Sequence, residues 1–273
     1  MKTLNKHVIL YDAECPMCKL YTRAFTKSGM LDANGRAAYQ HIPDAICPVV
    51  DRQRAVNEVA LVNISTGEVT YGISSLLKVT GNALPVFKPL FAWQPFIWFM
   101  SKVYAFISYN RRVIIPAPQH SGYSLQPTFR LNYRLYYLAF TWLLTSAVLT
   151  AYAHLLAGTV PVGNSYREYL ICGGQIIFQG LIITFYAPGK RWNYLGNMMT
   201  ISLAGTLMLS LGFVVNNFVL LSSGTYAAYF MAVAGLMFLE HIRRARLLGL
   251  GWLLTATWVA YRIALLLLIY KLN

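Results

Sequence analysis

The sequence predicts a chain of two parts, an α/β domain followed by an all-α transmembrane helical bundle of about five helices. All acidic residues except Glu168 and Glu240 lie before position 70, and long apolar stretches with few charges begin near Leu135. A chain of 273 residues has room for two domains. We expect the following segments: 1–112, the α/β domain; 113–130, a proline-containing linker; 131–273, the transmembrane helical domain.

The first residues have the pattern of a strand followed by a helix. His7–Tyr11 ("HVILY") is rich in β-branched and aromatic residues and predicts a buried strand. A helical pattern follows it, and its apolar positions are expected to form one stripe: Met17, Leu20, Tyr21, Ala24 and Phe25. Gly29 is expected near the end of this helix, with a turn at Asn34–Gly35.

The remaining elements of the α/β domain follow in a recognisable order. Residues 37–42 predict a second strand, and 44–56 a short helix or loop. The segments 58–64 and 69–72 read as a β-hairpin, and 73–84 as a further helix. The order β-α-β-(α)-β-β-α is that of a thioredoxin-like fold, with Cys-x-x-Cys where the first strand gives way to the first helix.

Residues 84–109 are apolar and aromatic, but three prolines and two lysines interrupt them. They fit either a helix of the soluble domain or an interfacial segment that docks this domain on the bilayer. We expect helices that pack against both.

Spanning a bilayer takes about 20 mostly apolar residues. The stretches that qualify are Leu135–Ala157, Tyr169–Ala187, Tyr194–Val215, the shorter Tyr226–Leu239, and Leu250–Tyr270. With the amino terminus inside, the inner side collects 20 cations and the outer side 2, both counted from the sequence. No signal-peptide pattern precedes the first strand. We therefore expect an integral protein of a bacterial inner membrane, with a cytoplasmic amino-terminal domain and the carboxyl terminus outside.

This topology also accounts for the net charge of +14. The cations are not clustered in the way that a nucleic-acid-binding face requires. Glycines in the spans are expected to let helices pack closely. Gln175 and Gln179 lie one turn apart and are expected to bond a neighbouring helix, whereas Arg262 is expected to snorkel outward. A pathway role is the alternative for the polar residues in the spans: His154, Gln175, Gln179, Asn197 and Arg262.

The Cys-Pro-Met-Cys motif predicts thiol chemistry at the start of the first helix. Cys15 is expected at the helix N-terminus, where unpaired backbone N–H groups favour a thiolate, with Pro16 in the first turn. Cys15 would attack a substrate disulfide, and Cys18, one turn further on, would resolve the mixed disulfide. Asp12 is the candidate base for the Cys18 proton, Glu14 opposes the thiolate and Lys19 offsets Glu14.

Two other interpretations of the motif stand beside this one. Cys15, Cys18, His41 and Cys47 are a candidate set of zinc ligands, although a second close pair is missing. The two thiols are alternatively inert residues of the core. Cys47 is expected to be structural, and Cys172 to lie across the bilayer from the motif.

The stretch "VILYDAECPMCKLY" resembles the opening motif of the DCC family of thiol-disulfide oxidoreductases. "EVALVNISTGEVTYGISSLLKV" and "VYAFISYNRR", with Tyr104, Asn110 and Arg111, are also similar to that family. The resemblance covers residues 7 to about 112 and implies a thioredoxin-like fold with a redox-active Cys15–Cys18 pair. Asp12 is the acidic residue of the motif, but Ala13 replaces the usual glycine, and no proline precedes Glu58–Ile64.

The sequence thus predicts a membrane-bound thiol-disulfide oxidoreductase that needs no cofactor. The expected partners are a protein or small-molecule thiol or disulfide and the lipid bilayer, with a quinone or a membrane protein as a further candidate. Tyr11, Pro16 and Arg111 are the candidates for contacts with substrate. The alternative is a transporter or membrane-assembly protein whose soluble domain docks partners or binds metal; a structural membrane protein with an inactive redox domain is a third reading.

Overall fold

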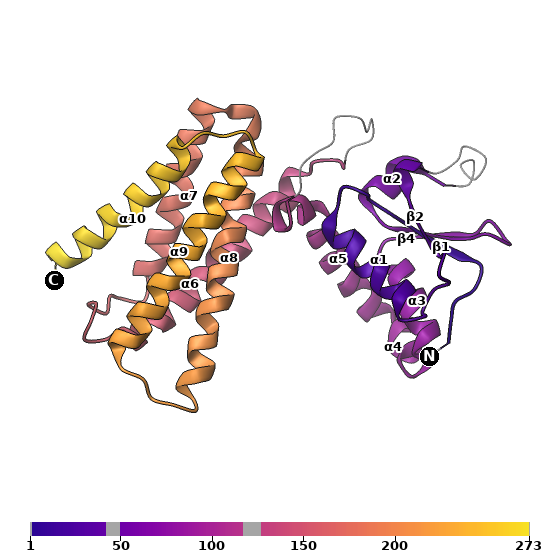
Figure 1. Cartoon of the computed structure of the whole chain (residues 1–273), viewed down its shortest axis with the longest axis horizontal. Helices are drawn as coiled ribbons and strands as arrows, with labels where there is room; N and C mark the ends of the chain where they lie inside the picture. Colours follow the sequence, from indigo (N-terminus) through magenta and orange to yellow (C-terminus); the bar gives the residue numbers. More distant parts are fainter. Residues whose placement is uncertain (1, 42–49, 117–126, 273) are drawn as a thin grey trace. The chain divides into compact units, whose positions relative to one another are not determined.

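The computed structural model describes residues 2–41, 50–116 and 127–272, which form two compact units (Figure 1). The first unit comprises Met1–Tyr133 and the second Arg134–Asn273. The division falls inside helix α6, two residues after its start at Leu131.

A four-stranded mixed sheet forms the centre of the first unit, in the order β2-β1-β3-β4. β1 (His7–Tyr11) pairs in parallel with β2 (Arg36–Ala38) and antiparallel with β3 (Ala60–Asn63), which pairs with β4 (Val69–Tyr71). The predicted first strand and the hairpin are confirmed. The second strand is shorter than 37–42, because Tyr39–His41 forms a 3₁₀ turn, η1.

Helix α1 (Pro16–Lys27) begins at the predicted place and ends before Gly29, whose φ of 73° suits glycine. Its predicted apolar stripe is confirmed at Tyr21 and Phe25, which pack against the core, and is wrong at Leu20 and Ala24. Leu20 is 71% exposed and Ala24 is also exposed. Cys18 and Thr22 are buried on the inward face in their place. Because each residue turns the helix by about 100°, a stripe through Cys18 places Leu20 on the opposite side.

Apolar side chains pack on both faces of the sheet, because successive residues of a strand point to opposite sides. Ile9 and Leu61 join one core cluster with Val79 of α3 (Ile73–Ala83). Leu10 and Val62 join a second cluster with Ala55 of α2 (Arg52–Asn57). The helix predicted at 73–84 is therefore confirmed. The segment 44–56, predicted as a short helix or loop, contains most of α2, and its residues 44–49 lie outside the described residues.

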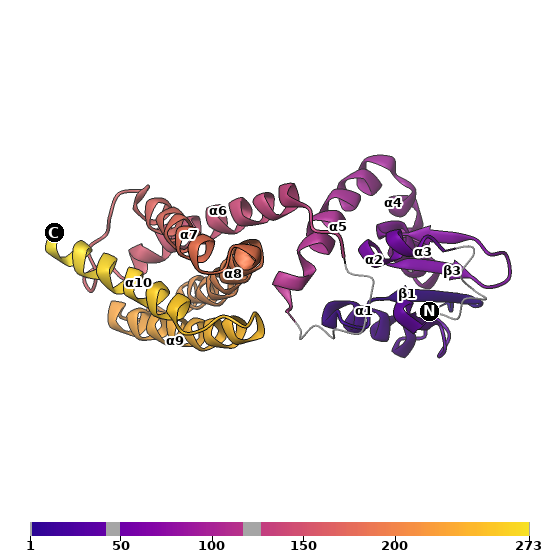
Figure 2. The same ribbon diagram turned by 90° about the horizontal axis from the view of Figure 1, so that it is seen from above.

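The segment after α3 is helical, as predicted for residues 84–109. A 3₁₀ turn, η3 (Pro85–Phe87), leads into α4 (Lys88–Ala92), and α5 (Gln94–Ile114) follows. α4 lies beside α3 and α5 in both views (Figures 1 and 2). Pro89 and Pro95 stand in the first turns of α4 and α5, where proline fits without breaking a helical hydrogen bond.

The second unit consists of helices that are long and apolar enough to cross a membrane, as predicted. The described residues contain five such helices, and a 3₁₀ turn, η4 (Pro188–Lys190), precedes the third. Their bounds are α6 Leu131–Leu155, α7 Arg167–Tyr186, α8 Arg191–Asn216, α9 Ser223–Leu247 and α10 Leu253–Leu272. α9 is a full-length span that extends the short predicted segment at both ends.

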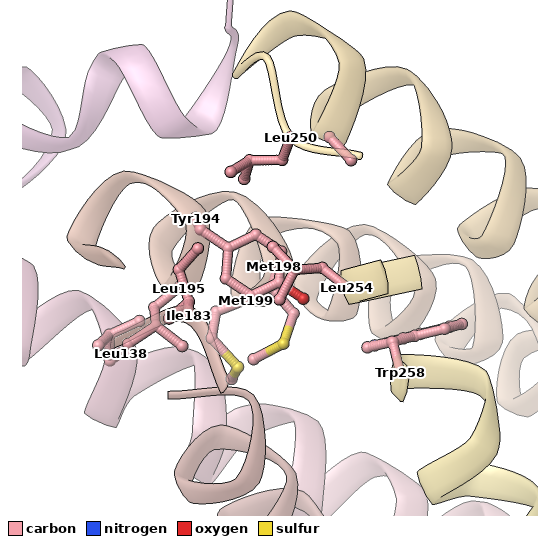
Figure 3. Close-up of a cluster of buried hydrophobic side chains, with 10 residues drawn as sticks. Leu138, Ile183, Tyr194, Leu195, Met198, Met199, Leu250, Leu254 and Trp258 are labelled. Atoms are coloured by element: carbon pink, nitrogen blue, oxygen red, sulfur yellow. The ribbon is translucent and has the colours of Figure 1, made fainter. Parts of the chain in front are cut away.

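An apolar cluster around Tyr194, Met198, Met199 and Trp258 fills part of the bundle (Figure 3). Polar side chains inside it bond across helices. The Tyr194 hydroxyl donates to Gln179 Oε1 at 2.8 Å and lies 3.1 Å from His241 Nε2. The predicted bonding of the two glutamines to a neighbouring helix is confirmed: Gln175 Nε2 donates to the Trp258 carbonyl, and Gln179 Nε2 to Thr257 Oγ1.

Arg262 does not snorkel outward, contrary to expectation. It lines a small internal cavity of about 10 Å³ together with Cys172 and Gln175. Its guanidinium carbon lies 6.0 Å from the centroid of the Trp258 ring, one turn nearer the start of α10, and this cation–π contact directs the side chain away from the outer helix end. Asn197 is also buried and accepts from Arg244 Nη1 at 3.0 Å, whereas His154 is exposed near the end of α6.

Candidate dithiol site

The two cysteines of the motif lie where β1 gives way to α1, with Cys15 as the N-cap residue. Its sulfur accepts the backbone N–H of Cys18 at 3.3 Å, and Pro16 occupies the first helical position. Both residues are free cysteines and both are buried, with exposed fractions of 3% for Cys15 and 7% for Cys18. The helix start therefore holds two thiols one turn apart and largely away from water.

The two thiols titrate as a pair, and the first proton leaves easily. A hydrogen bond from the Cys15 thiol and the charge on Arg111 outweigh the effect of burial and lower the pKa of Cys18 from its ordinary value of 9.0 to about 7. The same hydrogen bond, burial and the charge on Cys18 raise the pKa of Cys15. At pH 7 the pair thus carries one negative charge in about half of the molecules, and the second proton stays bound. Cys15 was expected to ionise first because of its position at the helix N-terminus, whereas in the structure the lower pKa belongs to Cys18.

The Asp12 carboxylate is buried beside the pair and is held by donors on both oxygens. Oδ2 accepts from Arg111 Nη2 at 2.9 Å, and Oδ1 accepts from Gln40 Nε2 at 2.8 Å and from the Glu14 N–H at 3.0 Å. Its charge opposes a thiolate on Cys18 and so raises the pKa of that thiol. The structure thus places Asp12 as a fixed, fully bonded carboxylate next to the dithiol.

Arg111, on α5, is the buried cation of the site, with an exposed fraction of 5%. Besides Asp12, its guanidinium donates to the Val56 carbonyl at 2.8 Å, to the Asn57 carbonyl at 3.3 Å and to Ser108 Oγ at 3.2 Å. Its Nε is buried and has no hydrogen-bond partner among the residues that the structure describes. Because Arg111 lowers the pKa of both cysteines, it acts as the counter-charge of the thiolate.

A second layer of polar side chains fixes the loop that carries the first cysteine. Gln40 donates to Asp12 through Nε2 and accepts the Ala13 N–H through Oε1 at 3.0 Å. Arg112 Nη2 pairs with Glu14 Oε2 at 3.0 Å and lies 3.7 Å from Asp12 Oδ2. Arg112 is thus an ion-pair partner of Glu14, whereas Lys19, which was expected to offset the effect of Glu14 on the thiolate, is exposed.

Two tyrosines complete the surroundings of Cys18. A hydrogen bond from the Tyr21 hydroxyl lowers the pKa of Cys18, and burial raises the pKa of Tyr21 itself. The Tyr104 hydroxyl accepts the Val59 N–H at 2.9 Å, and burial raises its pKa as well. Both tyrosines therefore stay protonated while the dithiol ionises. Sequence reasoning missed Tyr21 as a site residue, although its i, i+3 spacing from Cys18 was a usable signal.

The three candidates for substrate contacts lie in different surroundings. The Tyr11 ring is covered by Arg36, whose guanidinium carbon lies 4.4 Å from the ring centroid. Pro16 is half-buried at the helix start, next to the cysteines, while Arg111 is buried in the ion pair. Ala13 does not have a positive φ, so the residue that replaces the usual glycine adopts ordinary backbone geometry.

The described residues contain no group of three or more His, Cys, Asp and Glu side chains placed to hold a metal ion. His41 is exposed and does not join Cys15 and Cys18 in such a group. Cys47, the fourth proposed zinc ligand, lies outside the described residues.

Comparisons with protein-family models, curated proteins and solved structures found no match to this chain. The case for a function therefore depends on the geometry of the site.

Proposed function

We propose that the protein is a membrane-bound thiol-disulfide oxidoreductase that exchanges disulfides through Cys15 and Cys18. The observation that carries this proposal is a vicinal dithiol at a strand–helix junction, packed against a buried arginine that favours its thiolate. An inert pair of core cysteines has no need of such a counter-charge. The first unit would be a thioredoxin-like domain of the kind found in the DCC family, and it would lie on the cytoplasmic side.

The proposed reaction passes two electrons from the dithiol to a substrate disulfide. A cysteine thiolate attacks one substrate sulfur, an S–S bond forms to the protein, and the second substrate sulfur leaves as a thiolate that takes a proton from water. The other cysteine loses its proton to water, and its thiolate attacks the sulfur of the first cysteine in the mixed disulfide. This attack releases the first substrate sulfur as a thiolate and leaves a Cys15–Cys18 disulfide. A low-molecular-weight thiol of the glutathione class would reduce this disulfide, and the reverse sequence would oxidise a substrate.

The thiol–thiolate hydrogen bond supports Cys15 as the attacking sulfur even though Cys18 ionises first. Moving the shared proton from Cys15 to Cys18 produces a Cys15 thiolate, which the Cys18 N–H is positioned to stabilise. After the attack, Cys18 carries the proton that must leave before resolution. Arg111 and Tyr21 favour that second thiolate, and Asp12 opposes it, so the pair Asp12–Arg111 sets the balance.

Burial of both sulfurs favours a small disulfide as the first reactant. Exposed fractions of 3% and 7% leave little room for a folded protein to reach the sulfurs without movement at the start of α1. We therefore expect faster reaction with a small symmetrical disulfide than with a disulfide held inside a protein.

A redox titration of the purified full-length protein in detergent tests the proposal. Samples equilibrated across glutathione ratios are alkylated, and the Cys15–Cys18 peptide is followed by mass spectrometry. We expect a reversible two-electron transition with a potential between about −270 and −120 mV, the range of known exchange proteins. Cys15→Ala and Cys18→Ala should each abolish it, whereas Cys172→Ala should leave it intact. A Cys15–Cys18 pair that stays reduced at every glutathione ratio would refute the proposed oxidoreductase activity.

A further inference from the structure

Exposed large apolar side chains, most of them aromatic, occur along η3, α4 and the start of α5 in the first unit. We call this set the aromatic patch, and it consists of Val86, Phe87, Leu90, Trp93, Trp98 and Phe99. Val86 is 86% exposed and Trp98 is 66% exposed. Soluble proteins seldom expose so many large apolar side chains to water. Such a set of exposed residues indicates a surface that binds a membrane or another protein.

The patch is held on a fixed scaffold. Phe91 stacks between Phe87 and Phe96, with ring centroids 5.9 Å and 6.0 Å away. Gly81 of α3 lets Phe91 approach closely, because a Cβ at that position would lie 3.1 Å from the ring. The inner aromatic rings thus anchor the segment to α3, and the outer residues of the patch remain displayed.

The charges around the patch suit an anionic surface. Lys88 begins α4, and Lys102 Nζ lies 5.8 Å from the centroid of the Trp98 ring. The sequence from 69 to 167 contains no acidic residue. Tryptophan and lysine together are typical of the headgroup region of a bilayer, where an apolar body meets a charged or polar end.

A bilayer is also within reach of this surface, because the chain itself continues into the membrane. Residues 115–130 separate the end of α5 from the start of α6, and they span at most about 55 Å even when fully extended. We propose that the aromatic patch docks the first unit on the anionic surface of the same membrane that the second unit spans.

Docking would set the height of the dithiol above the membrane, a consequence that rests on the proposed function. α5 carries Trp98 and Phe99 of the patch near one end and Arg111 near the other. A rise of 1.5 Å per residue separates Trp98 from Arg111 by about 20 Å along the helix. The small disulfides served by the site would then be those located close to the membrane surface.

The test uses the full-length protein in vesicles made with brominated phospholipids, which quench tryptophan fluorescence on contact. The difference in emission between the wild type and Trp93→Phe/Trp98→Phe isolates these two residues from the tryptophans of the second unit. We expect this difference emission to be blue-shifted and quenched in vesicles that contain anionic lipid. Raising the salt to 1 M, where the Debye length is about 3 Å, should reduce the quenching.

Variants separate the patch from general effects on folding. Lys88→Glu/Lys102→Glu should lower the docking equilibrium constant about 30-fold and reduce the quenching with it, since each lysine contributes about 1 kcal/mol near an anionic surface. Leu20→Ser/Ile64→Ser removes exposed apolar side chains outside the patch and should leave the quenching unchanged. The Cys15→Ala/Cys18→Ala variant should also dock, so a failed redox assay and a failed docking assay are distinguishable.

Two outcomes would overturn the proposal. Emission from Trp93 and Trp98 that stays red-shifted and unquenched would show that the patch faces water. Emission that is blue-shifted but insensitive to brominated lipid would show that protein covers it, either a second copy or the chain's own helices.

Discussion

Arg111 Nη2 lies 2.9 Å from Asp12 Oδ2, and the two residues are 99 positions apart in sequence. Both side chains are almost fully buried, with 6% and 2% of their surface exposed. The ion pair joins the end of β1 to the last turns of α5 and stands directly beside the dithiol. Arg111 has a larger effect on the Cys18 pKa than Asp12 has, so the pair as a whole favours the thiolate.

Removing the cation should slow the thiol chemistry. In Arg111→Met the pKa of Cys18 should rise from about 7, because the positive charge that favours its thiolate is gone. A rise of about one unit would cut the thiolate fraction at pH 7 from about one half to about one tenth, and slow alkylation about fivefold. The rate of iodoacetamide labelling measures this, and an unchanged rate would show that Arg111 does not act on the thiols.

The same substitution should destabilise the first unit, because it removes the cation that lies 2.9 Å from the buried Asp12 carboxylate and leaves Arg112 at 3.7 Å. Breaking a buried pair by removing one partner costs about 3–5 kcal/mol. Asp12→Asn/Arg111→Met removes both charges and should recover part of this loss. Hydrogen exchange of the β1 and β3 amides in the full-length protein measures the local stability. Equal exchange in the single and double variants would contradict the expected coupling.

The two cysteines should change in opposite directions when each loses the other. In Cys15→Ala, Cys18 loses its hydrogen-bond donor, so its pKa should rise above about 7. In Cys18→Ala, Cys15 loses the hydrogen bond and the charge that raise its pKa, while Arg111 still favours its thiolate, so its pKa should fall. The pH dependence of alkylation of each remaining thiol measures both shifts. Shifts of the same sign would contradict the shared-proton arrangement.

The folded state of the reduced protein should become more stable as the pH rises through the pKa of Cys18. The Cys18 pKa is lower in the folded chain than its ordinary value of 9.0, so ionisation stabilises the folded state as the pH rises from about 7 to about 9. That contribution is lost as the pH falls through about 7. Local hydrogen exchange at α1, corrected for its intrinsic pH dependence, should show this gain in the wild type and a smaller one in Cys15→Ala.

Gly72 should resist substitution. Its φ of 64° and ψ of −139° belong to a region that residues with a side chain avoid, so Gly72→Ala should cost about 1–3 kcal/mol. Gly29→Ala is a matched control with a φ of 73°, open space around it and a place at a helix end, and it should cost less. Proteolysis rates of the first unit measure both variants. A Gly72→Ala protein as stable as the wild type would rule out this strain.

The second unit offers a prediction about its buried network. Tyr194→Phe removes the hydroxyl that donates to Gln179 and lies 3.1 Å from His241, leaving polar atoms on α7 and α9 without that partner. Hydrogen bonds inside membrane proteins contribute about 0.6–1.7 kcal/mol, so we expect a loss of that size. Thermal denaturation in detergent measures it, with the exposed Tyr166→Phe as control. Equal midpoints for the two variants would refute the role of the network.

Local patterns predicted most of the fold. The five membrane helices, the β1 strand, the hairpin and the N-cap position of Cys15 all follow from runs of neighbouring residues. The predicted apolar stripe of α1 was wrong at Leu20, which is apolar but points away from the sheet. Hydrophobicity alone did not reveal that a thiol and a threonine, Cys18 and Thr22, occupy the inward face.

The surroundings of the dithiol depend on residues far apart in sequence, which no local pattern joins. Gln40 reaches Asp12 across 28 positions and Arg112 reaches Glu14 across 98. Arg111 was found through a resemblance but assigned to substrate contact, because the sequence did not show that α5 returns to the end of β1. The prediction for Arg262 was wrong for a similar reason, because the other residues that line its cavity come from other helices.

The polar contacts of Tyr194 and its neighbours also have a consequence for chains whose synthesis stops early. Thr255 and Thr257 of α10 bond to His241 of α9 and Gln179 of α7, so the last helix supplies partners to helices synthesised before it. A chain released from the ribosome before α10 would carry these groups unmatched in lipid. Premature termination near Gly251 should therefore yield a product that the cell's membrane quality-control proteases remove, even though four of the five spans are intact.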